Sequence, residues 1–313
     1  MVYREDSSRY PKATTFSIIA RDPESGEMGV AVQSHWFSVG ARVAWAEAGV
    51  GVVATQAMVK ISYGPMGLKA MRSGASAPAA LQKLLVEDAQ REVRQVAMLD
   101  AQGQVATHTG KLTIADAGHV TGEQFSVQAN MMANPTIWSA MAEAYRGTRG
   151  HLSERMMAAM EAAQAAGGDI RGQQSACMVV VKAKASAHPC EDRLIDLRIE
   201  DHPTPIQELR RLLNIHQAYE LMDLGDQYVS KGEMDQAMEV YRRGANLAPH
   251  IAELPFWVAV TLADLGKLED ALPIFKEVFQ KDPDLARLVP RLIPANILHI
   301  SEDDLRQILK LNN

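Results

Sequence analysis

One stretch near the start of the chain, residues 14–34, constrains the fold more than any other. It reads TTFSIIARDPESGEMGVAVQS, and side chains alternate with a period of two over 15–20 and again over 28–33. Such alternation predicts two β-strands, and the Asp, Pro, Ser and Gly residues between them are typical of a tight turn. If this hairpin is symmetric, Thr15 lies opposite Gln33, although a slip of one residue would turn every side chain to the other face.

The patterns that follow predict strands and helices in alternating groups. This order favours two antiparallel sheets stacked between layers of helices, an α+β class, over a doubly wound parallel sheet. The expected strands are residues 42–48, 50–56, 94–100, 104–109, 125–131 and 176–182, and the expected helices are residues 65–72, a segment capped by Ser76, 135–145 and 152–166.

The composition changes after residue 184. Three prolines and mixed charges over 185–205 suit a linker, and everything beyond it has a helical pattern. Within that part a set of positions recurs after 34 residues, which is similar to the tetratricopeptide repeat: Gly232, Ala237, Tyr241 and Pro249 return as Gly266, Ala271, Phe275 and Pro283. We therefore expect an N-terminal arm at 1–13, an α+β domain at 14–184, the linker, and a helical domain at 206–313.

The charge and composition of the chain limit the classes of partner that it is expected to bind. The net charge of −6 favours neither nucleic acid nor an anionic membrane, and no apolar stretch is long enough to cross a bilayer. The first residues are polar and lack the apolar core of a signal peptide, so we expect a cytoplasmic protein. Two cysteines make neither a disulfide framework nor a four-cysteine zinc site. We expect no metal and no cofactor, and the Ala- and Met-rich composition suggests a homo-oligomer.

A threonine at the outer end of a strand has a chemical use if the peptide before it is removed. The freed α-amine has a pKa of roughly 7.7–8, so it can accept the proton of the threonine hydroxyl and make that hydroxyl a nucleophile. Thr15 is the main candidate and Thr14 the lesser one. The alternative is an ordinary β-branched strand residue in an uncut chain.

Amide side chains at the ends of other strands are candidate donors to an oxyanion. Gln56 and Asn130 are assigned this catalytic role, and Gln95 is expected opposite Thr109 as a substrate contact. The alternative is that these amides satisfy the backbone at strand ends.

Four charged or titratable side chains complete the predicted substrate contacts. His35 follows the second strand, Arg42 is expected beside Gln56, and Arg171 could bind a substrate carboxylate in a bidentate pair with Asp169 nearby. The alternatives are a hydrogen-bonded, partly buried His35 and an Asp169–Arg171 salt bridge that only fixes its loop.

Many of these runs together resemble a known family. They are TTFSIIARD, GVAVQSHWFSVGARV, GVVATQA, YGPMGL, RQVAMLDAQG, THTG, QANMMAN and AAGGDIRGQQSA. They are similar to the family called domain of unknown function 1028, which is placed among the N-terminal nucleophile (Ntn) hydrolases. The resemblance covers residues 14–184 and implies a four-layer αββα sandwich. The opening also resembles a proteasome β subunit, in which Thr15 or Thr14 matches the nucleophile. No lysine stands where the proteasome pattern has one, so that mechanism does not transfer intact.

These observations lead to two hypotheses. The first is an Ntn-type hydrolase of an amide-type bond in a small substrate, with Thr15 as nucleophile after removal of the arm, and with helical repeats that bind a peptide, a protein partner or a second subunit. The second is a non-catalytic scaffold of the same fold whose helical repeats mediate protein–protein interaction. The sequence names no substrate.

Overall fold

The structure is a computed structural model that describes residues 15–312. The arm expected at 1–13 and the candidate Thr14 lie outside the described residues. Contacts divide the chain into two compact units after Arg211, and each unit is described by itself below.

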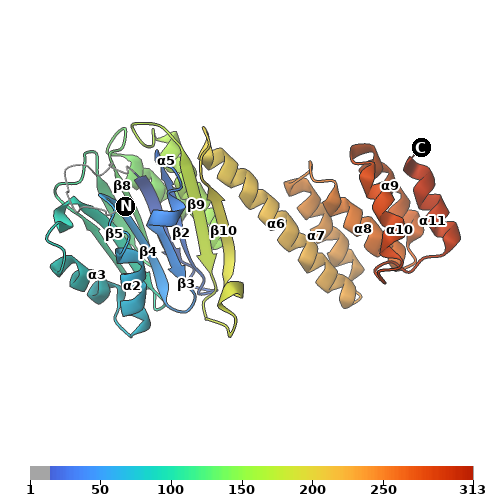
Figure 1. The fold of residues 1–313 in the computed structure, drawn as a ribbon, viewed down its shortest axis with the longest axis horizontal. Coiled ribbons are helices and arrows are strands. Elements are labelled where there is room, and N and C mark those ends of the chain that lie inside the picture. The colour runs from blue at the N-terminus through green and yellow to red at the C-terminus, as the bar shows by residue number, and fades with distance from the viewer. Residues whose placement is uncertain (1–14, 313) are drawn as a thin grey trace, which may run out of the picture. The chain divides into compact units, whose positions relative to one another are not determined.

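The first unit contains two antiparallel sheets (Figure 1). The larger sheet has the strand order β10-β9-β2-β1-β8-β7, and the smaller has the order β3-β4-β5-β6. The strands of the larger sheet are β1 (Thr15–Arg21), β2 (Met28–Ser34), β7 (Gly118–Gly122), β8 (Phe125–Asn130), β9 (Ser175–Val181) and β10 (Arg193–Ile199). Those of the smaller sheet are β3 (Ala44–Glu47), β4 (Gly51–Ala57), β5 (Arg94–Asp100) and β6 (Val105–Thr109).

Helices cover the outer face of each sheet. The smaller sheet packs against α2 (Tyr63–Arg72) and α3 (Ala77–Val86), and the larger one packs against α4 (Ile137–Gly147) and α5 (Leu152–Ala165). The inner faces meet in a core to which β1, β2 and β9 contribute apolar residues from one sheet, and β4 and β5 from the other. The α+β class and the αββα layering predicted from the sequence are confirmed.

Local signals explain several boundaries. Ser76 caps α3 as predicted, because its side chain accepts a hydrogen bond from the backbone N–H of Ala79 and Pro78 lies in the first turn. The continuous apolar strand β9 is buried along its whole length. The strand expected at 42–48 differs, because a short helix, α1 (Gly40–Val43), occupies its start and β3 begins only at Ala44.

The register of the first hairpin corrects the sequence prediction. Thr15 lies opposite Ser34, and Gln33 lies opposite Phe16. The turn comprises six residues, since Arg21 pairs with Met28 and the N–H of Asp22 donates to the carbonyl of Glu27. This moves the centre of the turn half a residue beyond Glu24, which shifts every pair by one.

Two strands were not expected. β7 is short and includes two glycines, so it carries little β-propensity. β10 lies inside the segment 185–205 that was expected to be a linker, and it pairs antiparallel with β9 at the edge of the sheet. Arg193 and Asp196 of β10 are exposed while Ile195 and Ile199 are buried. These alternating charges resemble linker composition, but they belong to the solvent-facing side of an edge strand.

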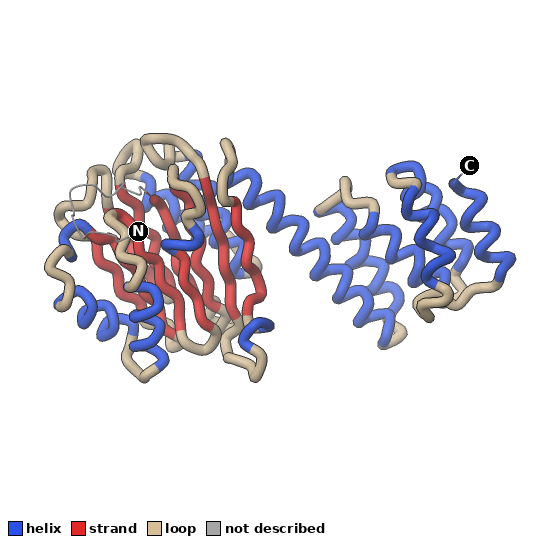
Figure 2. The backbone as a smooth tube through the Cα atoms, viewed as in Figure 1, coloured by secondary structure: helices blue, strands red, loops and turns tan. Residues whose placement is uncertain are grey.

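The second unit is all helical, as predicted (Figure 2). Helix α6 (Pro205–Ser230) carries the chain into it, and five helices follow: α7 (Met234–Leu247), α8 (Glu253–Asp264), α9 (Leu268–Lys281), α10 (Asp284–Leu292) and α11 (Glu302–Leu309). The repeated positions have matching environments. Ala237 and Ala271 are fully buried, and Tyr241 and Phe275 lie in the same apolar core. No helix in the described part of the chain is both long and apolar enough to span a membrane.

Candidate functional site

Thr15 is the first residue of β1 and lies between two neighbouring strands. It is paired with Ser34 of β2 on one side and with Asn130 of β8 on the other. Its side chain is buried, and its hydroxyl Oγ1 donates a hydrogen bond to Ser34 Oγ at 3.3 Å. The sequence analysis did not single out Ser34, because the one-residue error in register placed Gln33 there instead.

Two side-chain amides, one from each sheet, bind the main chain of this residue, and a third amide links them. Gln56 Nε2, from β4, donates to the main-chain carbonyl of Thr15 at 3.2 Å and to Gln95 Oε1 at 2.7 Å. Asn130 Nδ2 donates to the same carbonyl at 3.3 Å and to the same Gln95 oxygen at 3.0 Å. The structure therefore brings Gln56, Gln95 and Asn130 together beside Thr15, and of these Gln56 and Asn130 bind its main-chain carbonyl.

The same network continues between the sheets. Gln95 lies opposite Thr109, as predicted, and its Nε2 donates to Thr109 Oγ1 at 2.9 Å and to the carbonyl of Ala129 at 2.9 Å. The hydroxyl of Ser17 donates to Gln56 Oε1 and accepts from Gln128 Nε2, both at 2.6 Å. The alternation of polar residues along β1 and β8 was the signal that could have identified Ser17 and Gln128. Because these buried amides have partners, the network also holds the two sheets together.

The loop that contains Asp169 bonds to the chain just after β2 and just after β8, the two strands on either side of β1. Asp169 is buried, and its carboxylate accepts from the backbone N–H of His35 at 3.1 Å and from Arg171 Nε and Nη2 at 3.2 and 3.0 Å. The N–H of Ile170 donates to the carbonyl of Met131 at 3.3 Å. Since His35 follows Ser34 and Met131 follows Asn130, this loop joins the two strands that flank Thr15. Asp169 and Arg171 are therefore at the predicted end of the sandwich, in the geometry of a loop-fixing pair.

Within residues 15–312, the other two predicted substrate contacts, Arg42 and His35, do not join this hydrogen-bond network through their side chains. Arg42 is exposed on α1, where its carbonyl accepts from Trp45 Nε1 at 3.1 Å. It does not pair with Gln56, because the β3–β4 ladder begins at Ala44 and Ala54 and the chain before it is helical. The ring atom Nδ1 of His35 is buried and has no hydrogen-bond partner among the described residues.

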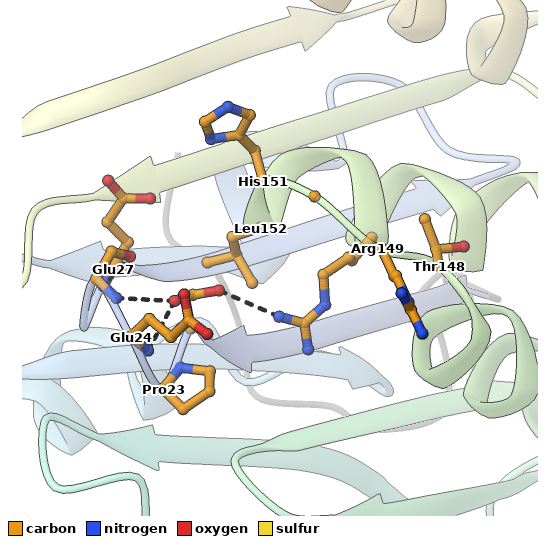
Figure 3. Close-up of a pocket in the computed structure, with 11 residues that line it drawn as sticks. Pro23, Glu24, Glu27, Thr148, Arg149, His151 and Leu152 are labelled. Carbon is orange, nitrogen blue, oxygen red and sulfur yellow. Dashed lines mark hydrogen bonds and ion pairs between the residues drawn. The ribbon is translucent and has the colours of Figure 1, made fainter.

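A small cavity adjoins the network. Its volume is about 20 Å³, enough for about one water molecule. It is lined by Asn130 and by residues from two chain bends, including Ala57 and Met131. Both of these residues have a positive φ, 67° and 55°, which is uncommon outside glycine and is often found at functional sites. A much larger pocket, of about 640 Å³, lies instead at the far end of β1, where the chain turns after Arg21 (Figure 3).

Titratable groups near the network do not form a metal centre. Among residues 15–312, no group of three or more His, Cys, Asp or Glu side chains is placed to hold a metal ion. His119 contacts Thr109 through Nδ1 at 2.8 Å. Burial, and then the nearby His108, lower the pKa of His119, which favours the neutral form of this ring.

Comparison with known proteins confirms the resemblance seen in the sequence. The model of a family described as "Family of unknown function (DUF1028)" matches residues 15–209. The chain belongs to the DUF1028 family. A crystal structure of a DUF1028 protein from Silicibacter pomeroyi is 31% identical, with a TM-score of 0.57, and the match covers 64% of this chain and 88% of that one. No curated protein matches this chain. The DUF1028 match runs past β10, so this strand lies within the family region.

Proposed function

We propose that the DUF1028 domain is an Ntn-type hydrolase of an amide-type bond in a small substrate. Thr15 is the nucleophile once residues 1–14 have been removed. The observation that carries this proposal is the placement of Thr15 at the start of β1, with Ser34 Oγ 3.3 Å from its hydroxyl and two amide donors on its carbonyl. A nucleophile needs such fixed neighbours to hold its geometry.

The chemistry follows from the freed amine. The α-amine of Thr15 takes the hydroxyl proton, Oγ1 attacks the substrate carbonyl carbon, and the amine leaving group departs with a proton as an ester forms on Thr15. Water then hydrolyses the ester. Gln56 and Asn130 bond to the main chain of Thr15, so the role that the geometry supports for them is to position the nucleophile. Asp169 and Arg171, beside the same strand ends, would shape the path by which a substrate reaches Thr15.

The decisive experiment is the intact mass of the purified chain together with turnover on a panel of small amides. We expect a species that begins at Thr15 and hydrolyses a member of the panel. Thr15→Ala should stay full length and inactive, whereas Thr15→Ser should keep the processing because it keeps a hydroxyl. Gln82→Ala, on the exposed face of α3, is the control. A full-length wild type without turnover, or equal processing of Thr15→Ala, would refute the assignment.

The alternative is a non-catalytic scaffold whose tetratricopeptide-like helices bind a peptide or protein. Its support is the burial of Thr15 and the fact that the amides of Gln56, Gln95 and Asn130 already have partners. The same mass measurement separates the two, because the scaffold requires no cleavage. Cytoplasmic location and homo-oligomerisation stay predictions, to be checked by fractionation and light scattering.

A further inference from the structure

A pocket at the other end of β1 is remote from Thr15. It has a volume of about 640 Å³ and lies between the β1–β2 turn and the loop that joins α4 to α5 (Figure 3). β1 is seven residues long, which puts the pocket roughly 20 Å from Thr15. The size is in the range of small-molecule sites. Its lining is mostly polar, which suits a polar ligand.

One part of the lining is rigid and electrically neutral. The Asp22 carboxylate accepts from the backbone N–H groups of Glu24 and Ser25, at 2.9 and 2.8 Å, and from Arg155 Nη1 at 3.1 Å. The Arg155 guanidinium lies over the ring of Tyr145, 4.5 Å from its centroid. Asp22 and Arg155 thus hold each other and fix the turn against α5.

Two other charged side chains of the lining come from different segments of the chain. Glu24, on the turn, and Arg149, on the α4–α5 loop, have exposed side chains that line the pocket. Neither side chain has an ion-pair partner within residues 15–312. They come from opposite walls and carry opposite charges, so each is free to meet a complementary group on a ligand.

One further feature favours an anionic group on the Arg149 side. Helix α5 begins at Leu152, which lines the pocket, and its N-cap His151 makes no side-chain cap. The positive end of the helix dipole at this first turn attracts negative charge.

We propose that this pocket binds a small zwitterion, a free amino acid or a short peptide with uncapped termini. Its carboxylate contacts Arg149 and its ammonium contacts Glu24. A simple anion would meet Glu24 and Glu27, and a simple cation would meet Arg149, so a ligand with both charges fits this lining best. The proposal is independent of the hydrolase, since it uses none of the residues around Thr15.

The test is a titration of the full chain, by calorimetry or NMR, with glycine, alanine, leucine and triglycine, and with triglycine capped at one end. We expect at least one zwitterion to bind with a millimolar or lower Kd. Acetylating its amine or amidating its carboxylate should each weaken binding about tenfold. Comparing the Kd values of glycine and alanine with that of triglycine shows whether the pocket prefers a free amino acid or a peptide.

Two variants test which residue contacts the carboxylate of the ligand and which contacts its ammonium group. Arg149→Ala should weaken binding of the zwitterion about tenfold but leave binding of its carboxyl-amidated form unchanged. Glu24→Gln should also weaken binding of the zwitterion about tenfold but leave binding of its N-acetylated form unchanged. Lys69→Ala, on the exposed side of α2, should change nothing, and Thr15→Ala should bind normally. The proposal is overturned if no zwitterion binds at millimolar concentration, if capping has no effect, or if both variants bind like wild type.

Discussion

Gln56 Nε2 donates a hydrogen bond to the carbonyl oxygen of Thr15 at 3.2 Å, and this contact joins the smaller sheet to the first residue of the larger one. Through Gln95 Oε1 the same nitrogen is linked to Asn130. The geometry of Thr15 therefore depends on side chains from three other strands. Any chemistry at Thr15, and the packing of the two sheets, rest on the same amides.

Replacing Gln56 with alanine should destabilise the first unit. The change removes one buried hydrogen-bond partner from each of Gln95, Ser17 and the Thr15 carbonyl, which should cost about 2–4 kcal/mol. Urea unfolding followed by tryptophan fluorescence measures this, because Trp36, Trp45 and Trp138 all belong to the first unit. Gln82→Ala should be within about 0.5 kcal/mol of wild type. Equal stability of both variants would mean that the network contributes nothing.

Asp88 should make the stability of the first unit sensitive to acid. Its carboxylate accepts from Arg94 Nε at 3.0 Å, from Tyr63 Oη at 3.2 Å and from the N–H of Gln90 at 3.0 Å. Burial acts to raise the pKa of Asp88, but the Gln90 N–H, Arg94 and Lys60 favour the charged form and lower the pKa overall. A lowered folded-state pKa gives stability that is present above about pH 4 and lost as the pH falls further.

The Asp88→Asn variant tests this sign. It should be about 2 kcal/mol less stable than wild type at pH 7, and the difference should shrink below about pH 4, where the wild-type carboxylate also becomes neutral. Thermal unfolding at a series of pH values gives the two curves. A gap that stays constant from pH 7 to pH 3 contradicts the prediction.

The two cysteines should differ sharply in reactivity. Cys177 is buried on β9, and burial is the main factor that raises its pKa to about 12, whereas Cys190 is exposed. Since the thiolate is the reactive form, a thiol reagent should label one site in the native chain and two after denaturation. Cys190→Ser should abolish native labelling. Rapid labelling of Cys177 in the folded chain is the opposing result.

Gly225 should be essential to the packing of the second unit. A Cβ at this position would lie 2.1 Å from Cε1 of Tyr241, whose hydroxyl is held by Asp226. Gly225→Ala should therefore cost about 1–3 kcal/mol through overpacking, although alanine is the better helix former. Gln227→Ala, exposed on the same helix, is the control. Helical circular dichroism during denaturation checks both, and a stabilised Gly225→Ala would show that α6 and α7 can move apart.

Local patterns in the sequence were sufficient for most elements. The period-two alternation at 15–20 and 28–33, the cap at Ser76 and the 34-residue spacing from Ala237 to Ala271 each predicted an element that the structure contains. These signals depend on neighbours within a few residues, or on a repeat of the same packing, so a single chain displays them directly. They also placed Thr15 and its amide partners at strand ends.

Contacts between distant segments decided the rest. The register that pairs Thr15 with Ser34 depends on the hydrogen bonds of one turn, and the pairing of β10 depends on an edge of β9 that the sequence does not reveal. The sequence by itself determined which side chains could serve a site, because residue type and alternation are local properties. Only the tertiary structure decided that Gln56, Gln95 and Asn130 meet at Thr15 while Arg42 stays outside, because register and sheet packing fix which strand ends coincide.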